Sequence, residues 1–119
     1  MLIIEKQFNN NYNFDSNDYG WYGLILWKCK LYNKSKIQYN NAIILSNYKD
    51  LINLNSYLQL IYEHFGDINE INNVLNYSLK LDNHNYVHYC KYGTSYMILK
   101  NYKKSQIMFE HSIQLNNEN

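Results

Sequence analysis

The sequence predicts an all-α fold in which short helices pair as hairpins. Three observations support this prediction. Apolar residues recur at helical spacing, the turns between apolar stretches are short, and no stretch alternates apolar and polar residues as a half-buried strand does. At 119 residues, the chain is long enough for one domain with a modest core.

Residues 86–119 show the helical pattern most clearly. Gly93, Ser105 and Ser112 are small and let two helices cross closely, while large residues fill the space around the crossing. The large residues are Tyr89, Tyr92, Tyr96, Tyr102 and Phe109. This stretch therefore predicts one helix-turn-helix unit.

Residues 16–49 repeat the pattern. The small residues are Gly23, Ser35 and Ala42, and the large ones are Tyr19, Tyr22, Leu26, Tyr32, Tyr39 and Leu45. Asp15 or Ser16 can cap the first helix by accepting a hydrogen bond from a free backbone N–H. We expect helices near 17–29 and 32–46, joined by a short turn.

Residues 52–85 carry a third copy with two departures. The residues that match are Leu58, Tyr62, Leu75, Ser78 and Leu81. Gln59 and Ile71 stand where the other copies have small residues, so we expect a crossing of the two helices that is looser or locally shifted. Asp50 and Leu51 are interpreted as a two-residue insertion before this copy that extends one helix end.

A turn divides the middle copy, and a further segment precedes the first copy. Gly66-Asp67 marks the turn, which predicts helices near 50–64 and 68–81. Residues 1–15 are apolar at first and are then interrupted by three asparagines. We expect them to form a partial preceding repeat or an N-terminal cap, and an unstructured tail is the alternative.

The three copies resemble the tetratricopeptide (TPR) repeat, a helix-turn-helix unit with a period of about 34 residues. The resemblance covers 16–49, 52–85 and 86–119, and it implies a TPR-like α-solenoid, an α-α superhelix of about three repeats. Asn117 stands where the family pattern has Pro. TPR arrays usually end in a solvating cap helix and none is visible here, so we expect a segment of a longer protein.

The TPR resemblance also implies that the first helix of each repeat lines a concave, protein-binding groove. The residues that it places there are Trp21, Leu24, Trp27, Lys28, Tyr57, Leu60, Lys91 and Met97. Aromatic and aliphatic side chains on a concave face suggest an apolar peptide or helix as the ligand. Trp21 and Tyr57 are the expected anchors, and Lys28 and Lys91 the rim charges. Packing of this patch against other parts of a longer array is the alternative.

Two narrower groups of TPR proteins bear on the groove positions and on the first copy. Chaperone-binding TPR domains hold a terminal carboxylate with five polar side chains, and the matching positions here are Gly20, Leu24, Tyr57, Val87 and Lys91. One cation cannot fix a carboxylate bidentately, so no such clamp is expected. The stretch Tyr19-Gly-Trp-Tyr-Gly-Leu is similar to a segment of the TPR scaffold subunits of the anaphase-promoting complex, which suggests a subunit of a larger assembly of this kind.

Composition excludes several classes of function. With 11 basic and 10 acidic residues the net charge is +1, so no broad attraction to nucleic acid or to an anionic membrane is expected. No apolar run approaches the length of a membrane helix, which needs roughly 18 residues. Two cysteines far apart in sequence fit a reducing compartment. We therefore expect an intracellular protein, cytoplasmic or nuclear.

No set of side chains converges on catalytic or metal-binding chemistry, so we expect neither an enzyme nor a cofactor. His84 and His88 have a spacing that can bind a metal on one helix face, but His84 falls in the turn between copies and no fourth ligand is near. Cys29 and Cys90 lie in no motif of the kind that activates a nucleophilic thiol. Solvated surface residues are the simpler interpretation.

The expected function is a non-enzymatic scaffold or adaptor that binds an apolar peptide or helix of a protein partner in its groove. The alternative is a structural self-association module. In that case the apolar repeat ends, around Ile107, Ile113 and Leu115, stack on another copy of the chain.

Overall fold

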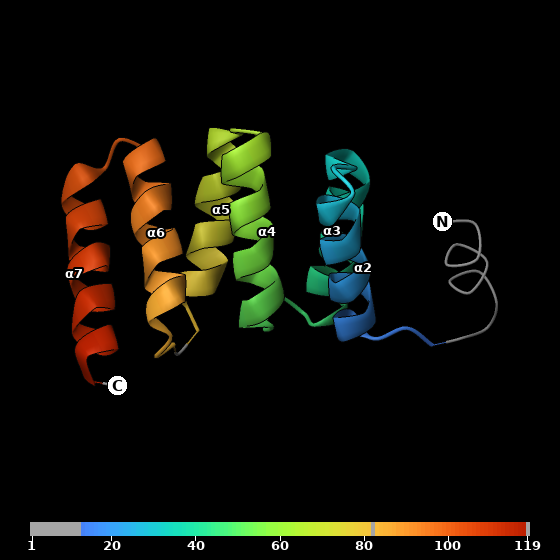
Figure 1. The fold of residues 1–119 in the computed structure, drawn as a ribbon, viewed down its shortest axis with the longest axis horizontal. Coiled ribbons are helices and arrows are strands. Elements are labelled where there is room, and N and C mark those ends of the chain that lie inside the picture. Colours follow the sequence, from blue (N-terminus) through green and yellow to red (C-terminus); the bar gives the residue numbers. More distant parts are fainter. Residues whose placement is uncertain (1–12, 82, 119) are drawn as a thin grey trace.

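The computed structural model describes residues 13–81 and 83–118, and within them all regular elements are α-helices (Figure 1). They are α2 (Ser16–Lys28), α3 (Tyr32–Leu45), α4 (Leu51–His64), α5 (Ile68–Leu79), α6 (Tyr86–Ile98) and α7 (Tyr102–Glu118). The predicted all-α class is confirmed. The repeat fragment or cap expected over 1–15 falls mainly on residues outside the described ranges.

The helices form three hairpins, α2–α3, α4–α5 and α6–α7, placed in a row along a molecule of 48 × 28 × 22 Å (Figure 1). α3 packs on α4 and α5 on α6, and the first helices of the hairpins also meet, α2 with α4 and α4 with α6. Among the described residues, α3 and α5 have no Cα atoms within 8 Å of each other, and neither do α5 and α7. The first helices therefore lie closer together than the second helices.

Each hairpin starts at a capped helix. The N-cap residues are Asp15, Asp50 and Asn85, evenly spaced by 35 residues, and each accepts a hydrogen bond from a backbone N–H of the first turn. Asp15 forms a reciprocal capping box with Asp18 through bonds of 2.9 and 3.0 Å. Asp50 is the cap of α4 and Leu51 is its first residue, so the segment interpreted as an insertion forms the start of the helix expected near 50–64.

Glycine and serine set the helix crossings in the two outer hairpins. A Cβ on Gly23 would lie 3.0 Å from the Tyr39 ring, and one on Gly93 would lie 2.7 Å from the Phe109 ring. In the same two crossings, the hydroxyls of Ser35 and Ser105 donate to the glycine carbonyls at 2.7 Å. The small residues predicted for these crossings thus let the paired helices approach closely.

The middle hairpin is built differently, and the register predicted for its first helix is wrong. α4 has 14 residues where α2 and α6 have 13. Its extra residue lies at the C-terminal end, where Gly66 adopts a positive φ of 65°. Leu58, fully buried, therefore takes the place that Gly23 has in α2, and Gln59 lies one residue beyond the crossing.

The hydrophobic core is centred on this middle hairpin and extends into both neighbours. Its buried members are Tyr39, Ile43, Leu54, Tyr57, Leu58, Leu60, Ile61, Ile71, Val74, Leu75, Tyr92 and Tyr96. A buried polar network also joins the second and third hairpins. The Asn55 side chain donates to the Tyr92 hydroxyl at 3.1 Å and accepts from Ser78 at 3.0 Å. These contacts fix the positions of α4 and α6 relative to each other.

Candidate protein-binding groove

Two large apolar side chains stand exposed over one hollow between α2 and α4. Trp21 of α2 is 67% exposed, and Ile52 of α4 is 70% exposed. The hollow between them measures about 210 Å³. It is lined by Asn17, Gly20, Trp21, Leu24, Tyr39, Ile52, Asn53 and Ser56. Both side chains can therefore be covered by a single ligand seated between the two helices.

A second hollow continues the first toward the C-terminal end of α2. It measures about 390 Å³ and is lined by Leu24, Trp27, Lys28, Lys30, Tyr32, Tyr39, Ser56 and Gln59. Leu24, Tyr39 and Ser56 line both hollows, so the two hollows are adjacent, and together they are called here the α2–α4 trough. Its far half carries the exposed cations Lys28 and Lys30, and among the described residues no carboxylate lines either half.

The start of the trough is held by Asn53. Its side-chain amide donates to the Ser16 carbonyl at 3.2 Å and to the Asp50 carboxylate at 3.0 Å. A Cβ on Gly20 would lie 2.2 Å from the Asn53 amide oxygen, so a larger residue there would displace the Asn53 amide. The bonds tie the first turn of α4 to the first turn of α2, and thereby fix the spacing of Trp21 and Ile52.

Aromatic contacts hold the far half of the trough. The Trp27 ring meets the rings of Tyr39 and His64 edge-on, with centroids 6.4 and 6.0 Å apart. The Tyr32 ring stacks on His64 with centroids 3.8 Å apart. Trp27 is partly buried against the core as a result. It forms a wall of the trough, and of the two tryptophans Trp21 is the one with a free face.

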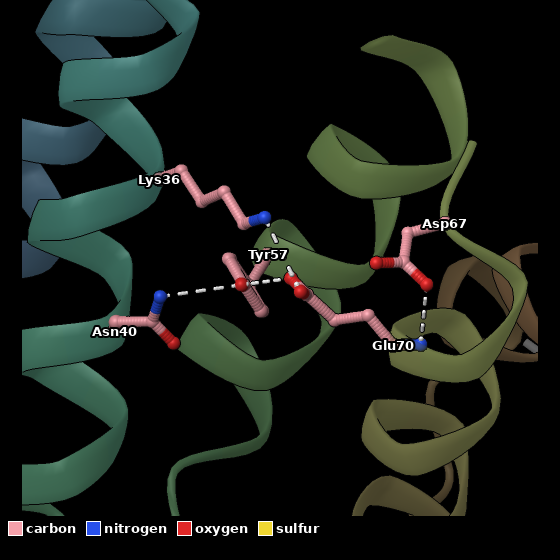
Figure 2. Close-up of polar contacts among 5 residues, drawn as sticks. All are labelled: Lys36, Asn40, Tyr57, Asp67 and Glu70. Carbon is pink, nitrogen blue, oxygen red and sulfur yellow. Dashed lines mark hydrogen bonds and ion pairs between the residues drawn. The ribbon is translucent and has the colours of Figure 1, made fainter. Parts of the chain in front are cut away.

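Tyr57 and Leu60, predicted as groove residues, are in the core instead, with 3% and 0% exposure. Tyr57 points toward α3 and α5, where its hydroxyl donates to Glu70 and accepts from the Asn40 amide at 3.3 Å (Figure 2). Burial, followed by the hydrogen bond to Glu70, raises the pKa of Tyr57. Glu70 also forms an ion pair with Lys36 at 3.2 Å (Figure 2).

Tyr57 and Leu60 lie in the core because the register of α4 differs by one residue from the predicted one. A shift of one residue turns a side chain by about 100° around a helix, which moves Tyr57 and Leu60 from the trough to the core. Ser56 and Gln59 line the trough in their place, and Ile52 is the exposed apolar residue that sequence reasoning missed. The even spacing of Asp15, Asp50 and Asn85 was the available signal.

Lys91 and Met97 belong to α6 and do not line the α2–α4 trough. Met97 is 48% exposed. Burial lowers the pKa of Lys91, and the nearby charge of Glu63 opposes that shift. Burial, as the larger cause, and the nearby charge of Glu63 raise the pKa of Tyr62 of α4 to about 12. The structure thus separates these two predicted residues from Trp21, Leu24, Trp27 and Lys28, which lie together.

The described residues offer no obvious site for metal chemistry. No three His, Cys, Asp or Glu side chains in 13–81 and 83–118 are grouped so that they could hold a metal ion. His88 contacts the Asn83 side chain at 3.2 Å, and the Cys90 sulfur lies 3.0 Å from the Ser112 hydroxyl. Over the same part of the chain, every helix is too short or too polar to span a bilayer.

Comparison with known proteins adds no relative. No protein-family model matches the chain, and no curated protein matches it either.

Proposed function

We propose that this chain is a non-enzymatic protein-interaction module, in which three TPR-like repeats form a short α-solenoid that binds a peptide segment of a protein partner. The exposure of Trp21 and Ile52 over one hollow carries the proposal. Large aromatic side chains in concave sites supply much of the binding energy of protein interfaces. Evenly spaced helix caps and the closer packing of the first helices support a curved array with these helices on its inner side.

The chemistry of the trough defines the partner. An apolar side chain of the peptide covers Trp21 and Ile52 at one end, and acidic side chains meet Lys28 and Lys30 at the other. No carboxylate of the lining opposes such a peptide, so the charges of the two partners are complementary. The preferred ligand is therefore a segment with an apolar anchor followed or preceded by acidic residues.

Selection from a random displayed-peptide library, followed by titration of the synthesised peptides, tests this proposal. The chain has two tryptophans, so Trp27→Phe leaves Trp21 as the only one. Peptides that share an apolar and an acidic part should shift the Trp21 emission to the blue as they bind. Trp21→Ala removes this signal and is therefore titrated by calorimetry. It should weaken binding more than about tenfold, because truncated interface anchors commonly cost ≥ 2 kcal/mol.

The matched control is Ile44→Ala, which truncates an apolar residue of α3 that is 61% exposed and lies outside the trough. It should leave peptide affinity unchanged. Lys28→Ala should weaken binding less than Trp21→Ala and reduce its salt dependence, since rim charges act mainly on association rates. Selection that enriches no peptide, or peptides that bind Trp21→Ala as well as wild type, would contradict the proposal.

A further inference from the structure

α7 carries a row of apolar side chains whose counterparts in α3 pack against the next hairpin. Tyr102 is 64% exposed, Ile113 is 61% exposed, and Phe109 lies between them on the same side of the helix. These residues follow α7 at the spacing that Tyr32, Tyr39 and Ile43 have in α3. The two rows are therefore the same surface in the first and third hairpins.

In α3 this surface is an interface, because the next hairpin covers it. The Tyr32 ring stacks on His64 of α4, the Tyr39 ring lies 6.5 Å from that of Tyr57, and Ile43 is only 3% exposed. Among the described residues, α6 is the only helix with Cα atoms within 8 Å of α7; the Phe109 ring lies against Gly93 of α6, whereas Tyr102 and Ile113 stay exposed. The exposed row is thus one half of an interface whose full form is present within the molecule.

The other half is exposed on the first hairpin. Leu60 of α4 and Ser95 of α6 are fully buried, and each of these helices follows another hairpin. Ile25 has the same place in α2, 35 residues before Leu60, yet it is 50% exposed. On the adjoining helix α3, Ile37 is 57% exposed. This face of α2 and α3 corresponds to the face that α4 and α5 present to α3, where Asn73 of α5, the counterpart of Ile37, lines a hollow with Asn40 and Ile43.

We propose that a second copy of this chain stacks head-to-tail, with the α2–α3 face of one copy on the α7 row of the other, continuing the internal arrangement of hairpins. Repetition of the internal α3–α4 geometry argues for a copy of this chain over an unrelated protein. The contact is heterologous, so each added copy exposes the same two faces again, and the average mass rises with concentration. This inference is independent of peptide binding in the trough.

Charge complementarity supports the same pairing. Within the molecule, Tyr57 bridges Asn40 of α3 and Glu70 of α5. In the outer hairpins, Glu110 of α7 has the place of Asn40 and Tyr22 of α2 has the place of Tyr57. Lys34 of α3 has the place of Glu70. Stacking therefore brings the exposed Glu110 carboxylate of one copy to the exposed Lys34 ammonium of the next, and these charges are of opposite sign.

Sedimentation of two complementary variants tests the proposal. Ile25→Asp blocks the α2–α3 face and leaves the α7 row intact, whereas Ile113→Asp does the reverse. Wild-type protein should show a rising average mass from micromolar to millimolar concentration, and each variant alone should remain monomeric. An equimolar mixture should form a dimer, because one good face remains on each variant.

The controls separate folding and trough binding from association. Both substituted residues are half-exposed or more, so circular dichroism should stay helical. Ile52→Asp alters the trough and should leave association unchanged. Lys34→Glu and Glu110→Lys should each weaken association, and their combination should restore it.

Three results would overturn the proposal. A wild-type chain that stays monomeric throughout the concentration range leaves no association to explain. An Ile25→Asp or Ile113→Asp variant that associates as wild type does would indicate a symmetric contact that uses only one of the faces. A mixture of the two variants that stays monomeric would show that the faces are not complementary.

Discussion

Two glycines determine how closely the helices of the outer hairpins approach. At Gly93 the approach is the closer, since a Cβ there would lie 2.7 to 2.9 Å from three carbon atoms of the Phe109 ring. Ordinary van der Waals contact between carbon atoms needs about 3.5 Å or more, so any larger side chain must displace that ring. The Gly93 carbonyl also accepts the Ser105 hydroxyl bond at 2.7 Å, which a wider crossing would break.

Gly93→Leu should therefore lower the free energy of unfolding by about 1–3 kcal/mol or more. Urea unfolding followed by circular dichroism measures this loss. Met97→Leu is the matched control, because it places the same side chain on the same helix at a position that is 48% exposed, and it should change stability little. Equal stability of the two variants would contradict the close crossing of α6 and α7.

At the scale of single elements, the register of α4 decides which residues belong to the core and which to the trough. Apolar residues occur on several sides of this helix, and Leu54, Leu58 and Ile61 form only one of its apolar rows. Leu60 and Tyr57 are buried as well, and the Tyr57 hydroxyl contacts residues of α3 and α5. Ile52 and Gln59 line the trough.

Leu60→Ala should cost about 2–5 kcal/mol of stability, because it removes buried methyl groups and leaves a cavity in the core. Gln59→Ala should stay within about 0.5 kcal/mol of wild type, as substitutions of partly exposed side chains usually do. Thermal or urea unfolding of the two neighbouring variants makes the comparison. If Leu60→Ala is neutral and Gln59→Ala destabilises, α4 has the register that periodicity alone suggested.

At the scale of the whole molecule, burial is distributed unevenly along the row of hairpins. α4 buries seven residues, including Leu58, Leu60 and Ile61, whereas the buried residues of α7 are Ser105 and Ser112. In an array whose units contact only their neighbours, local opening starts where the fewest apolar contacts hold the chain. The third hairpin should therefore open before the second.

Native-state hydrogen exchange tests this order. Amides of α7 should exchange through openings of lower free energy than those of α4, which should exchange only through global unfolding. The measurement belongs at low protein concentration, because head-to-tail stacking would cover α7 and raise its protection. Equal protection of α4 and α7 in dilute solution would mean that the molecule unfolds as a single cooperative unit.

The sequence by itself determined the helices and the crossings of the outer hairpins. Local rules suffice for these features, since Asp15 caps the helix that follows it, and a Cβ on Gly23 or Gly93 would lie 3.0 Å or less from an aromatic ring. Only the tertiary structure decided the register of α4 and the residues of the trough. With apolar residues on several sides, α4 keeps an apolar row when it is shifted by one residue, so periodicity could not choose between the two registers. Packing against α3, α5 and α6 made that choice, and it placed Tyr57 in the core and Ile52 beside Trp21.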